Sequence, residues 1–280
     1  MKKERIDTLL VDRGLIGSRE KAKRAVMAGL VYSGTERLDK PGMKIDHEAP
    51  LEVKGQLMPY VSRGGFKLEK ALKVFDVDVR DKIMLDIGAS TGGFTDCALQ
   101  NGASLVYALD VGYNQLAWKI RQHEQVVVME RTNFRYVKPE DLQEGLPEFA
   151  SIDVSFISLK LILPTLKTVL CAGGDVLALV KPQFEAGREQ VGKKGIVRDP
   201  AIHEQVLLNV SEMANKEGFH VRALDYSPIT GGEGNIEFLM HLTLPLDENE
   251  TVSKLNDSTI QDVVKQAQQL NTKASESDQS

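Results

Sequence analysis

The sequence predicts an α/β protein in which a small basic domain precedes a larger domain built on a mostly parallel sheet. Between Lys82 and Leu244, seven apolar runs rich in β-branched residues alternate with stretches of helical spacing. Residues 1–59 hold 12 Lys or Arg and 9 Asp or Glu, a net charge of +3, whereas residues 60–280 carry −8. We therefore predict three parts, at residues 1–59, 60–246 and 247–280.

The overall composition is that of a globular protein. The chain has 280 residues, of which 42% are hydrophobic and 27% charged. No apolar run is long enough to span a bilayer, and the first residues lack the pattern of a secretory signal. Cys97 and Cys171 lie far apart, and no Cys/His cluster has metal-ligand spacing. We therefore expect a cytoplasmic protein with no membrane partner, no structural disulfide and no metal site.

The first 55 residues predict two short helices followed by short strands. Ile6, Leu9 and Leu10 form an apolar stripe at helical spacing. Ser18 is placed to cap the second helix, because its hydroxyl can accept from free amides, and Gly29 ends that helix. Three strands are then expected in "LVYSG", "MKI" and "LEVKG", with a turn at 35–42.

Basic residues on the second predicted helix suggest a polyanion partner for this head. A plain solvated helix face is the alternative, and charge alone does not separate the two. From Arg5 to Val31 the chain follows "R-x-D-x-L-L" and then "S-R-E-x-A-x-x-x-V-x-x-G-x-V". This pattern resembles the small RNA-binding module named after a small-subunit ribosomal protein, also called the alpha-L motif. The RNA-binding candidates in this part are Arg5, Arg13, Arg19, Lys21, Lys23 and Arg24.

Alternation of strands and helices after Lys82 predicts a parallel sheet with helices on both faces. The last two strands are separated by little more than "TGGEG", so they should form an antiparallel hairpin at one edge. Pro164 predicts a kink or a late start in one helix. Seven strands with a terminal hairpin resemble the class I, Rossmann-like methyltransferase sheet. The expected strands are "KIMLDIG", "SLVYALDVG", "VVVMERTNF", "FASIDVSFIS", "GDVLALVKPQF", "HVRALDYSPI" and "NIEFLMHLTL".

The turn "LDIGASTGGFTD" follows the first strand and opens a helix, as nucleotide-binding turns do. Its glycine spacing is not that of a dinucleotide fingerprint, and no Lys-Ser/Thr pair follows as in a P-loop. With an acidic residue ending the second strand, this turn favours S-adenosylmethionine. The candidate cofactor-binding residues are Asp86, Gly88, Ser90, Thr91, Gly92, Gly93, Phe94, Asp110 and Asn133.

Three of these candidates have separate expected roles. Asp86 is expected to accept from the methionine ammonium of the cofactor. Asp110, at the end of the second strand, is expected to accept from both ribose hydroxyls, although an ordinary strand-end turn former would look the same. Asn133 ends the third strand and is a candidate for the adenine side.

Four charged residues mark the expected catalytic site. Lys67 opens a helix just ahead of the cofactor turn, while Asp153, Lys181 and Glu237 flank apolar strands. Ligands bind at the carboxyl ends of the strands in an open parallel sheet. Charges next to apolar strands are costly unless paired, so we predict that these two acids and two amines cluster. The alternative is four unrelated strand-end charges.

The order Lys–Asp–Lys–Glu resembles the FtsJ-type ribose 2′-O-methyltransferases. With the N-terminal module and the motifs "SRGGFKL", "DVSFISL", "LVKPQFE", "GIVRDP" and "GNIEFL", residues 3–245 resemble the TlyA family. This resemblance implies methylation of cytidine in ribosomal RNA or ribosomal subunits, with Lys181 as the proton acceptor. Lys194 departs from the pattern, where a glycine is expected, which puts the local loop shape in doubt.

The chemistry independently favours a lysine base. A ribose hydroxyl is a weak acid, so a base must take its proton as the new bond forms. The pKa of lysine, about 10.4 in water, falls with burial and with a like charge nearby and rises beside a carboxylate. Lys181 near Lys67 is therefore the predicted base, and Asp153 and Glu237 are expected to orient the two amines and the hydroxyl.

Two further segments carry predictions. Residues 183–199, with Arg188, Lys193 and Arg198, are expected to form a mobile flap that meets RNA phosphates, or else a plain solvated loop; Arg63 is a further RNA candidate. The tail after Leu246 has 7 acidic and 3 basic residues. Within it, 258–270 predicts an amphipathic helix and 271–280 a disordered end.

Two other classes of function stay open on the sequence. The chain would suit a non-catalytic RNA-binding or ribosome-assembly factor, although the intact quartet and cofactor turn oppose that reading. The resembling family is also often labelled haemolysin, but a pore former needs secretion and a membrane-active segment, and the sequence offers neither.

Overall fold

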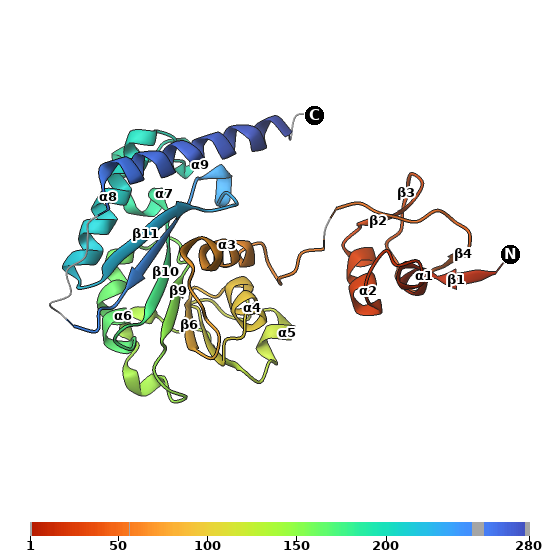
Figure 1. The fold of residues 1–280 in the computed structure, drawn as a ribbon, viewed down its shortest axis with the longest axis horizontal. Coiled ribbons are helices and arrows are strands. Elements are labelled where there is room, and N and C mark those ends of the chain that lie inside the picture. The colour runs from red at the N-terminus through yellow and green to blue at the C-terminus, as the bar shows by residue number, and fades with distance from the viewer. Residues whose placement is uncertain (1, 56, 248–254, 278–280) are drawn as a thin grey trace. The chain divides into compact units, whose positions relative to one another are not determined.

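The structure is a computed structural model and describes residues 2–55, 57–247 and 255–277. It divides into two compact units, Met1–Pro59 and Tyr60–Ser280, each with its own hydrophobic core (Figure 1). Within the described residues, no helix has both the length and the apolarity that crossing a membrane would require.

The N-terminal unit packs two helices against short strands. Helices α1 (Ile6–Asp12) and α2 (Arg19–Met27) share a core that includes Ile6, Leu10 and Val26. Ser18 caps α2 as predicted, because its Oγ accepts the Lys21 N–H at 3.3 Å. The strands are β1 (Lys3–Arg5), β2 (Val31–Ser33), β3 (Glu36–Arg37), β4 (Lys44–Asp46) and β5 (Glu52–Val53), paired as β1–β4 and β3–β2–β5.

Two of these strands are absent from the sequence-based expectation. β1 pairs antiparallel with β4, and β3 lies inside the segment 35–42 that was expected to be a turn. Strands of two or three residues are too short to show an alternating pattern, so their partners define them.

The second unit contains the predicted seven-stranded sheet. Its order is β11–β12–β10–β9–β6–β7–β8, with parallel pairing from β10 to β8. The hairpin β11–β12 is antiparallel and lies at one edge, as expected. The strands are β6 (Ile83–Ile87), β7 (Leu105–Leu109), β8 (Val126–Met129), β9 (Phe149–Ile152), β10 (Asp175–Val180), β11 (His220–Tyr226) and β12 (Phe238–Thr243).

Helices cover both faces of this sheet (Figure 1). α3 (Gly65–Phe75) and α4 (Gly93–Gln100) pack on one face through residues such as Leu68 and Ala98. α6 (Leu163–Val169) and α8 (Pro200–Lys216) pack on the other. Pro164 lies in the first turn of α6, so the expected late start is confirmed. Shorter helical elements are α5 (Trp118–Arg121), α7 (Pro182–Glu185), η1 (Phe134–Tyr136), η2 (Pro139–Asp141), η3 (Leu159–Leu161), η4 (Arg188–Gln190), η5 (Lys193–Gly195) and η6 (Gly232–Gly234).

Residues 114–122, "NQLAWKIRQ", have helical spacing, but only Trp118–Arg121 form the helix α5. The Glu130 carboxylate accepts hydrogen bonds from the backbone N–H groups of residues 114–116 at 2.9 to 3.3 Å. These bonds hold that stretch as a loop, and they replace the amide partners that a helix would supply.

The polar tail contains one helix that packs on the second unit. α9 (Asp257–Ser277) includes the expected amphipathic helix, with Ile260, Val264 and Ala267 buried in the core of the second unit. The bounds of α9 extend through residues 271–277, and the expectation of disorder there stays a prediction. Tertiary packing of the apolar stripe stabilises a helix whose composition alone favours disorder. Residues 248–254 and 278–280 lie outside the described residues.

Candidate active site

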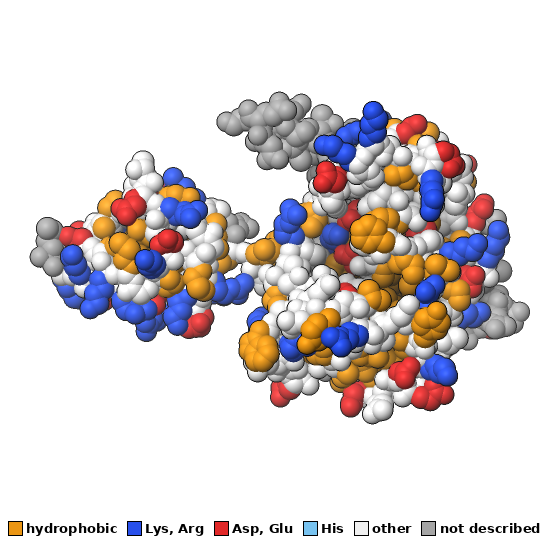
Figure 2. All heavy atoms as spheres, turned by 180° about the vertical axis from the view of Figure 1, so that it is seen from behind, with side chains coloured by type: hydrophobic (Ala, Val, Ile, Leu, Met, Phe, Trp, Pro, Cys, Tyr) orange, Lys and Arg blue, Asp and Glu red, His pale blue; other side chains and the backbone are white. Residues whose placement is uncertain are grey.

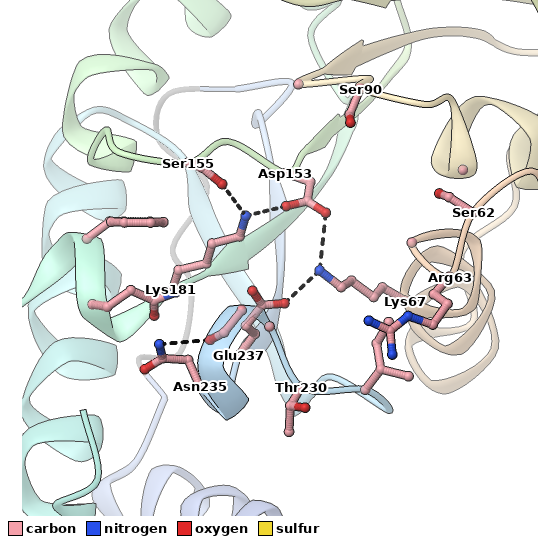
Figure 3. A pocket seen from close by; sticks show the side chains of 18 of the residues that line it. Ser62, Arg63, Lys67, Ser90, Asp153, Ser155, Lys181, Thr230, Asn235 and Glu237 are labelled. Atoms are coloured by element: carbon pink, nitrogen blue, oxygen red, sulfur yellow. Dashed lines mark hydrogen bonds and ion pairs between the residues drawn. The ribbon is translucent and has the colours of Figure 1, made fainter. Parts of the chain in front are cut away.

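The predicted quartet comes together in space (Figure 3). Lys67 of α3 lies with its Nζ 2.6 Å from Glu237 Oε2 and 3.3 Å from Asp153 Oδ2. The other oxygen of Asp153 lies 2.5 Å from the Nζ of Lys181. Asp153 therefore bridges the two amines, with Lys67 and Lys181 approaching it from different sides.

Topology explains this clustering. Asp153 follows β9 and Lys181 follows β10, which are parallel neighbours, so their carboxyl ends coincide. Glu237 precedes β12, which runs antiparallel to β10, so the start of β12 meets the same edge. Lys67 reaches this edge from the first turn of α3.

Three members of the quartet are buried and Asp153 is half-buried, and the charges of the four residues depend on one another. Lys67 and Lys181 are each 7% exposed. Burial lowers the pKa of Lys67, but the carboxylates of Asp153 and Glu237 outweigh it, so the net pKa is raised. Burial raises the pKa of Asp153, and the two ammonium groups outweigh that effect and lower it. Lys67 is thus held as an ammonium ion and Asp153 as a carboxylate.

Two residues of this cluster are absent from the sequence-based set. Lys181 Nζ donates a hydrogen bond to Ser155 Oγ at 3.2 Å, so this hydroxyl helps to aim the amine. At Gly231, an added Cβ would lie 2.2 Å from Glu237 Oε1, so the loop approaches that carboxylate too closely for a side chain. The sequence could have indicated Ser155, because it lies two residues after Asp153. Gly231 lies in "TGGEG", which the sequence analysis interprets only as a hairpin turn.

The quartet forms part of the wall of a pocket with a volume of about 660 Å³, within the range of small-molecule sites. One half of the wall comes from 62–64 and from the glycine-rich turn, including Ser90, Thr91 and Phe94. Arg63, predicted to bind RNA, lies in this wall. The other half, called the target half here, consists of Ser155, Phe156, Gln183, Phe184, Lys194, Gly195, Ile229, Thr230, Gly231, Gly232, Glu233 and Asn235.

The glycines of the turn have distinct physical reasons. Gly88 has φ +89°, and a Cβ there would lie 2.4 Å from the carbonyl oxygen of Asp153. Gly92 has φ +94° and caps α4. At Gly93 a Cβ would lie 2.2 Å from Ser62 Oγ, so this glycine admits the segment before α3. The turn, called the glycine cradle here, therefore combines left-handed backbone with close approach to Asp153 and to the segment before α3.

Asp86, the expected acceptor for the cofactor ammonium, already has partners inside the fold. Its side chain is 0% exposed, and its two oxygens accept from Thr95 Oγ1 at 2.7 Å and Ser151 Oγ at 2.8 Å. Desolvation raises the pKa of Asp86 to about 6, although the two hydroxyl groups oppose the shift. Asp86 therefore joins β6 to α4 and β9 from inside the fold.

A pH-dependent stability follows from Asp86. Because its pKa is raised from 3.8 to about 6 on folding, the folded state holds this proton more strongly than the unfolded state does. Stability is lost as pH rises from 4 to 7, by roughly 3 kcal/mol from this group. Asp86→Asn has no titrating group at this position. As pH rises from 4 to 7, the free energy of unfolding of the variant should therefore increase relative to that of wild type by about that amount. Urea unfolding at pH 4, 5, 6 and 7 measures the difference, and a constant difference would contradict it.

Asp110 and Asn133 lie outside the set of residues that line the pocket. Asp110 follows β7 and accepts the backbone N–H groups of Ser90 at 2.8 Å and Gly112 at 2.7 Å, so it ties the turn to the next strand end. Asn133 caps η1, because its Oδ1 accepts the Arg135 N–H at 3.2 Å. The Asn133 side chain, which was expected on the adenine side of the cofactor, is therefore already used as a helix cap.

Several of the N-terminal cations have structural partners. Arg5 forms two hydrogen bonds with the fully buried Asp7, at 2.9 and 2.8 Å, and lowers the pKa of that carboxyl to about 2. Arg13 donates to the carbonyl groups of residues 47 and 49, and Arg24 donates to the Met58 carbonyl at 2.8 Å. These guanidinium groups form hydrogen bonds within the N-terminal unit and also contribute to its positive charge.

The remaining cations lie on the surface of the same unit. Arg19 is within 3.5 Å of Asp7, and Lys23 pairs with the exposed Glu20 at 2.7 Å. Lys21 is exposed. Figure 2 shows Lys and Arg side chains gathered along one margin of this unit. An exposed pair such as Lys23–Glu20 contributes little to stability, so these side chains are available to a polyanion.

The segment from Pro182 to Pro200 follows a defined path. Ile196 and Val197 are buried, while the predicted RNA-binding residues Arg188, Lys193 and Arg198 are exposed. Mobility of this segment stays a prediction. Lys194 has φ +66° and lines the pocket. This left-handed backbone explains why a glycine is the expected residue at position 194.

Glu185 joins the loops that follow β9 and β10. Its carboxylate accepts Ser158 Oγ at 2.6 Å and the Leu159 N–H at 2.8 Å. Burial raises the pKa of Glu185. Beside this link, the rings of Phe156 and Phe184 lie with centroids 5.1 Å apart. The link therefore holds the aromatic part of the target half.

Two family models match the chain. The model of the FtsJ-like methyltransferases matches residues 60–244, and the model of the S4 domain matches residues 4–50. The two matches fall on either side of the boundary between the two structural units.

Relatives of similar length match both units. YqxC of Bacillus subtilis, whose name includes the words rRNA methyltransferase, is 65% identical over 95% of this chain and 94% of its own. The 16S/23S rRNA (cytidine-2′-O)-methyltransferase TlyA of Mycobacterium tuberculosis is 40% identical over 92% of this chain and 96% of its own. Hemolysin A of Brachyspira hyodysenteriae is 42% identical over 86% of this chain and 100% of its own.

A solved structure from Streptococcus thermophilus, with the word hemolysin in its name, is also similar. It has a TM-score of 0.76 and 58% identity over 99% of both chains.

Proposed function

The chain belongs to the FtsJ-like methyltransferases and, among them, to the TlyA family, and we propose that it transfers a methyl group from S-adenosylmethionine to a ribose 2′-hydroxyl of ribosomal RNA. The name of the Mycobacterium tuberculosis relative supports cytidine as the target nucleoside. The S4 match and the cationic margin of the N-terminal unit support binding of ribosomal RNA, free or in a subunit, in the cytoplasm.

The observation that carries this proposal is the bridged quartet. Asp153 holds the amines of Lys67 and Lys181 with one oxygen each, at 3.3 and 2.5 Å, inside a pocket that also contains the glycine cradle. A non-catalytic RNA-binding factor has no use for two buried lysine amines held against two carboxylates, an arrangement that costs desolvation energy.

The residues of this chain fit the cofactor and the reaction. Residues 88–91, 93 and 94 of the glycine-rich turn line the pocket, so a nucleoside would lie against them, and the cofactor, when bound, supplies an electrophilic methyl group. Lys181 Nζ is the proposed acceptor of the 2′-hydroxyl proton; the hydroxyl oxygen would bond to the methyl carbon as the carbon–sulfur bond of the cofactor breaks. Asp153 and Ser155 aim that amine, and the Lys67 ammonium, held by Glu237, orients the hydroxyl oxygen.

Phe156 supports a place for the target base. This ring is 91% exposed, lines the target half and has φ +64°, a backbone conformation that a bulky residue rarely adopts. Strain of this kind persists where the surroundings enforce it, often at ligand sites. An exposed aromatic ring beside the catalytic amine can stack on a base taken out of its helix.

Removal of this ring should weaken RNA use without unfolding the protein. Phe156→Ala is expected to lower kcat/KM for RNA roughly tenfold, because stacking on a base contributes about 1–3 kcal/mol. Tyr136→Ala is the matched control, since Tyr136 is 72% exposed and lies outside the pocket wall. Steady-state kinetics measure kcat/KM for both variants, and thermal melting shows whether either variant is less stable than wild type. Equal kcat/KM for the two variants would remove Phe156 from the site.

The proposed function itself is tested by transfer and by mapping. Purified protein with tritiated S-adenosylmethionine should label ribosomal RNA or subunits, and the label should map to 2′-O-methyl groups. Cells that lack the gene should lose the same methyl groups. RNA binding and cofactor binding without any transfer would instead favour an assembly factor.

A further inference from the structure

A continuous chain of hydrogen bonds joins the C-terminal helix α9 to two loops of the target half. The Gln268 amide of α9 lies 3.3 Å from His203 Nδ1, and His203 Nε2 lies 3.1 Å from the Val197 carbonyl oxygen. The Val197 N–H donates to Asn235 Oδ1 at 3.1 Å. Asn235 then donates from Nδ2 to the Gly195 carbonyl at 3.0 Å.

The central member of this chain is His203 of α8, which is completely buried. The Val197 carbonyl can act as an acceptor, so His203 Nε2 carries the hydrogen and Nδ1 accepts from Gln268. Burial lowers the pKa of His203 and so favours this neutral form. The imidazole also meets the Phe238 ring edge-on, with centroids 5.5 Å apart, next to the catalytic Glu237.

Both loops joined by these hydrogen bonds contain a non-glycine residue with left-handed backbone. Lys194 has φ +66° and Glu233 has φ +56°, and both line the target half. A non-glycine residue keeps such a conformation when its surroundings over-determine it. Val197 lies three residues after Lys194, and Asn235 lies two residues after Glu233, so the hydrogen bonds act close to the strained positions.

We propose that His203 is a positioning residue that holds the two loops of the target half, with Gln268 of α9 as its outer support. The nature of the ligand held there rests on the proposed function, but the restraint on the loops does not. α9 lies beyond residues 60–244, the region matched by the methyltransferase model, so this support is an addition to the catalytic fold.

Two near-isosteric variants separate the hydrogen bond from the bulk of the ring. In His203→Gln the amide nitrogen reaches the place of Nε2 and can still donate to Val197, whereas in His203→Asn it reaches no farther than Nδ1. Hydrogen exchange on the full chain should rise at least tenfold at 194–197 and 231–235 in the Asn variant and stay near wild type in the Gln variant. Exchange at 86–94, in the cofactor turn, should be unchanged in both. Equal exchange in the two variants, or a parallel rise at 86–94, would overturn the inference.

Kinetics give an independent readout. The Asn variant should lose about tenfold in kcat with a cofactor Kd within twofold of wild type, and the Gln variant should regain most of the rate. A cofactor Kd that weakens in step with kcat would overturn a positioning role and indicate general unfolding. Gln268→Leu should raise exchange at 194–197 two- to threefold, and no rise would remove α9 from the inference. Failure of wild type to transfer methyl groups would sink the proposed function, while the exchange result would still decide the role of His203.

Discussion

Lys181→Ala is expected to lower the rate of methyl transfer by about 10²–10⁴-fold, the usual contribution of a general base. The amine that this change removes lies 2.5 Å from Asp153 and 3.2 Å from Ser155, at the border of the target half. The glycine cradle stays intact, so the affinity for S-adenosylmethionine should stay near that of wild type. Single-turnover transfer and cofactor titration measure the two quantities separately.

A loss of rate from misfolding must be distinguished from a loss of the base. Lys82→Ala is the matched control, because Lys82 also forms a partly buried ion pair, 3.1 Å from Asp175. It lies just before β6, at the amino-terminal end of the sheet, away from the pocket. This control should lower the melting temperature but keep the transfer rate. If Lys181→Ala keeps more than a few per cent of the wild-type rate, Lys181 is not the base.

Deletion of residues 1–59 is expected to leave cofactor binding intact and to weaken RNA binding by roughly 10²-fold at moderate salt, because phosphate contacts dominate such affinities. The deleted unit holds its own core, and the second unit keeps its separate hydrophobic clusters without it. The remaining chain, residues 60–280, has a net charge of −8, so repulsion of RNA adds to the lost contacts.

Salt dependence and a point variant make this result specific. The slope of log affinity against log salt should be shallower for the deleted chain, because fewer phosphate groups are neutralised. In the full chain, Lys21→Gln should reduce affinity modestly without a change in melting temperature, because Lys21 is exposed. Arg5→Gln, in contrast, should lower the melting temperature by leaving the buried Asp7 without its bidentate partner. RNA affinity unchanged by the deletion would overturn the assigned role of the N-terminal unit.

The four members of the charged quartet could be identified from the sequence because of the way the sheet is built. Asp153 and Lys181 each follow a strongly apolar strand, and parallel neighbours bring their carboxyl ends together whatever the loops do. The glycine-rich turn was equally visible, because its backbone requirement is local. The partners of Asp86 could not be identified in the same way, since no local pattern shows that Thr95 and Ser151 donate to its two oxygens.

The sequence by itself determined the seven strands of the large sheet, most helices, the boundary after Pro59 and the four charged residues, because hydrophobic period and turn residues act over a few positions. The tertiary structure decided which polar groups remain available to a ligand. Arg5 and Asn133 are used by near neighbours, and His203 is held by Val197 and by Gln268, which lies 65 residues further along the chain. The physical reason is that a buried polar group must find a partner, and in a folded chain that partner often comes from a distant segment.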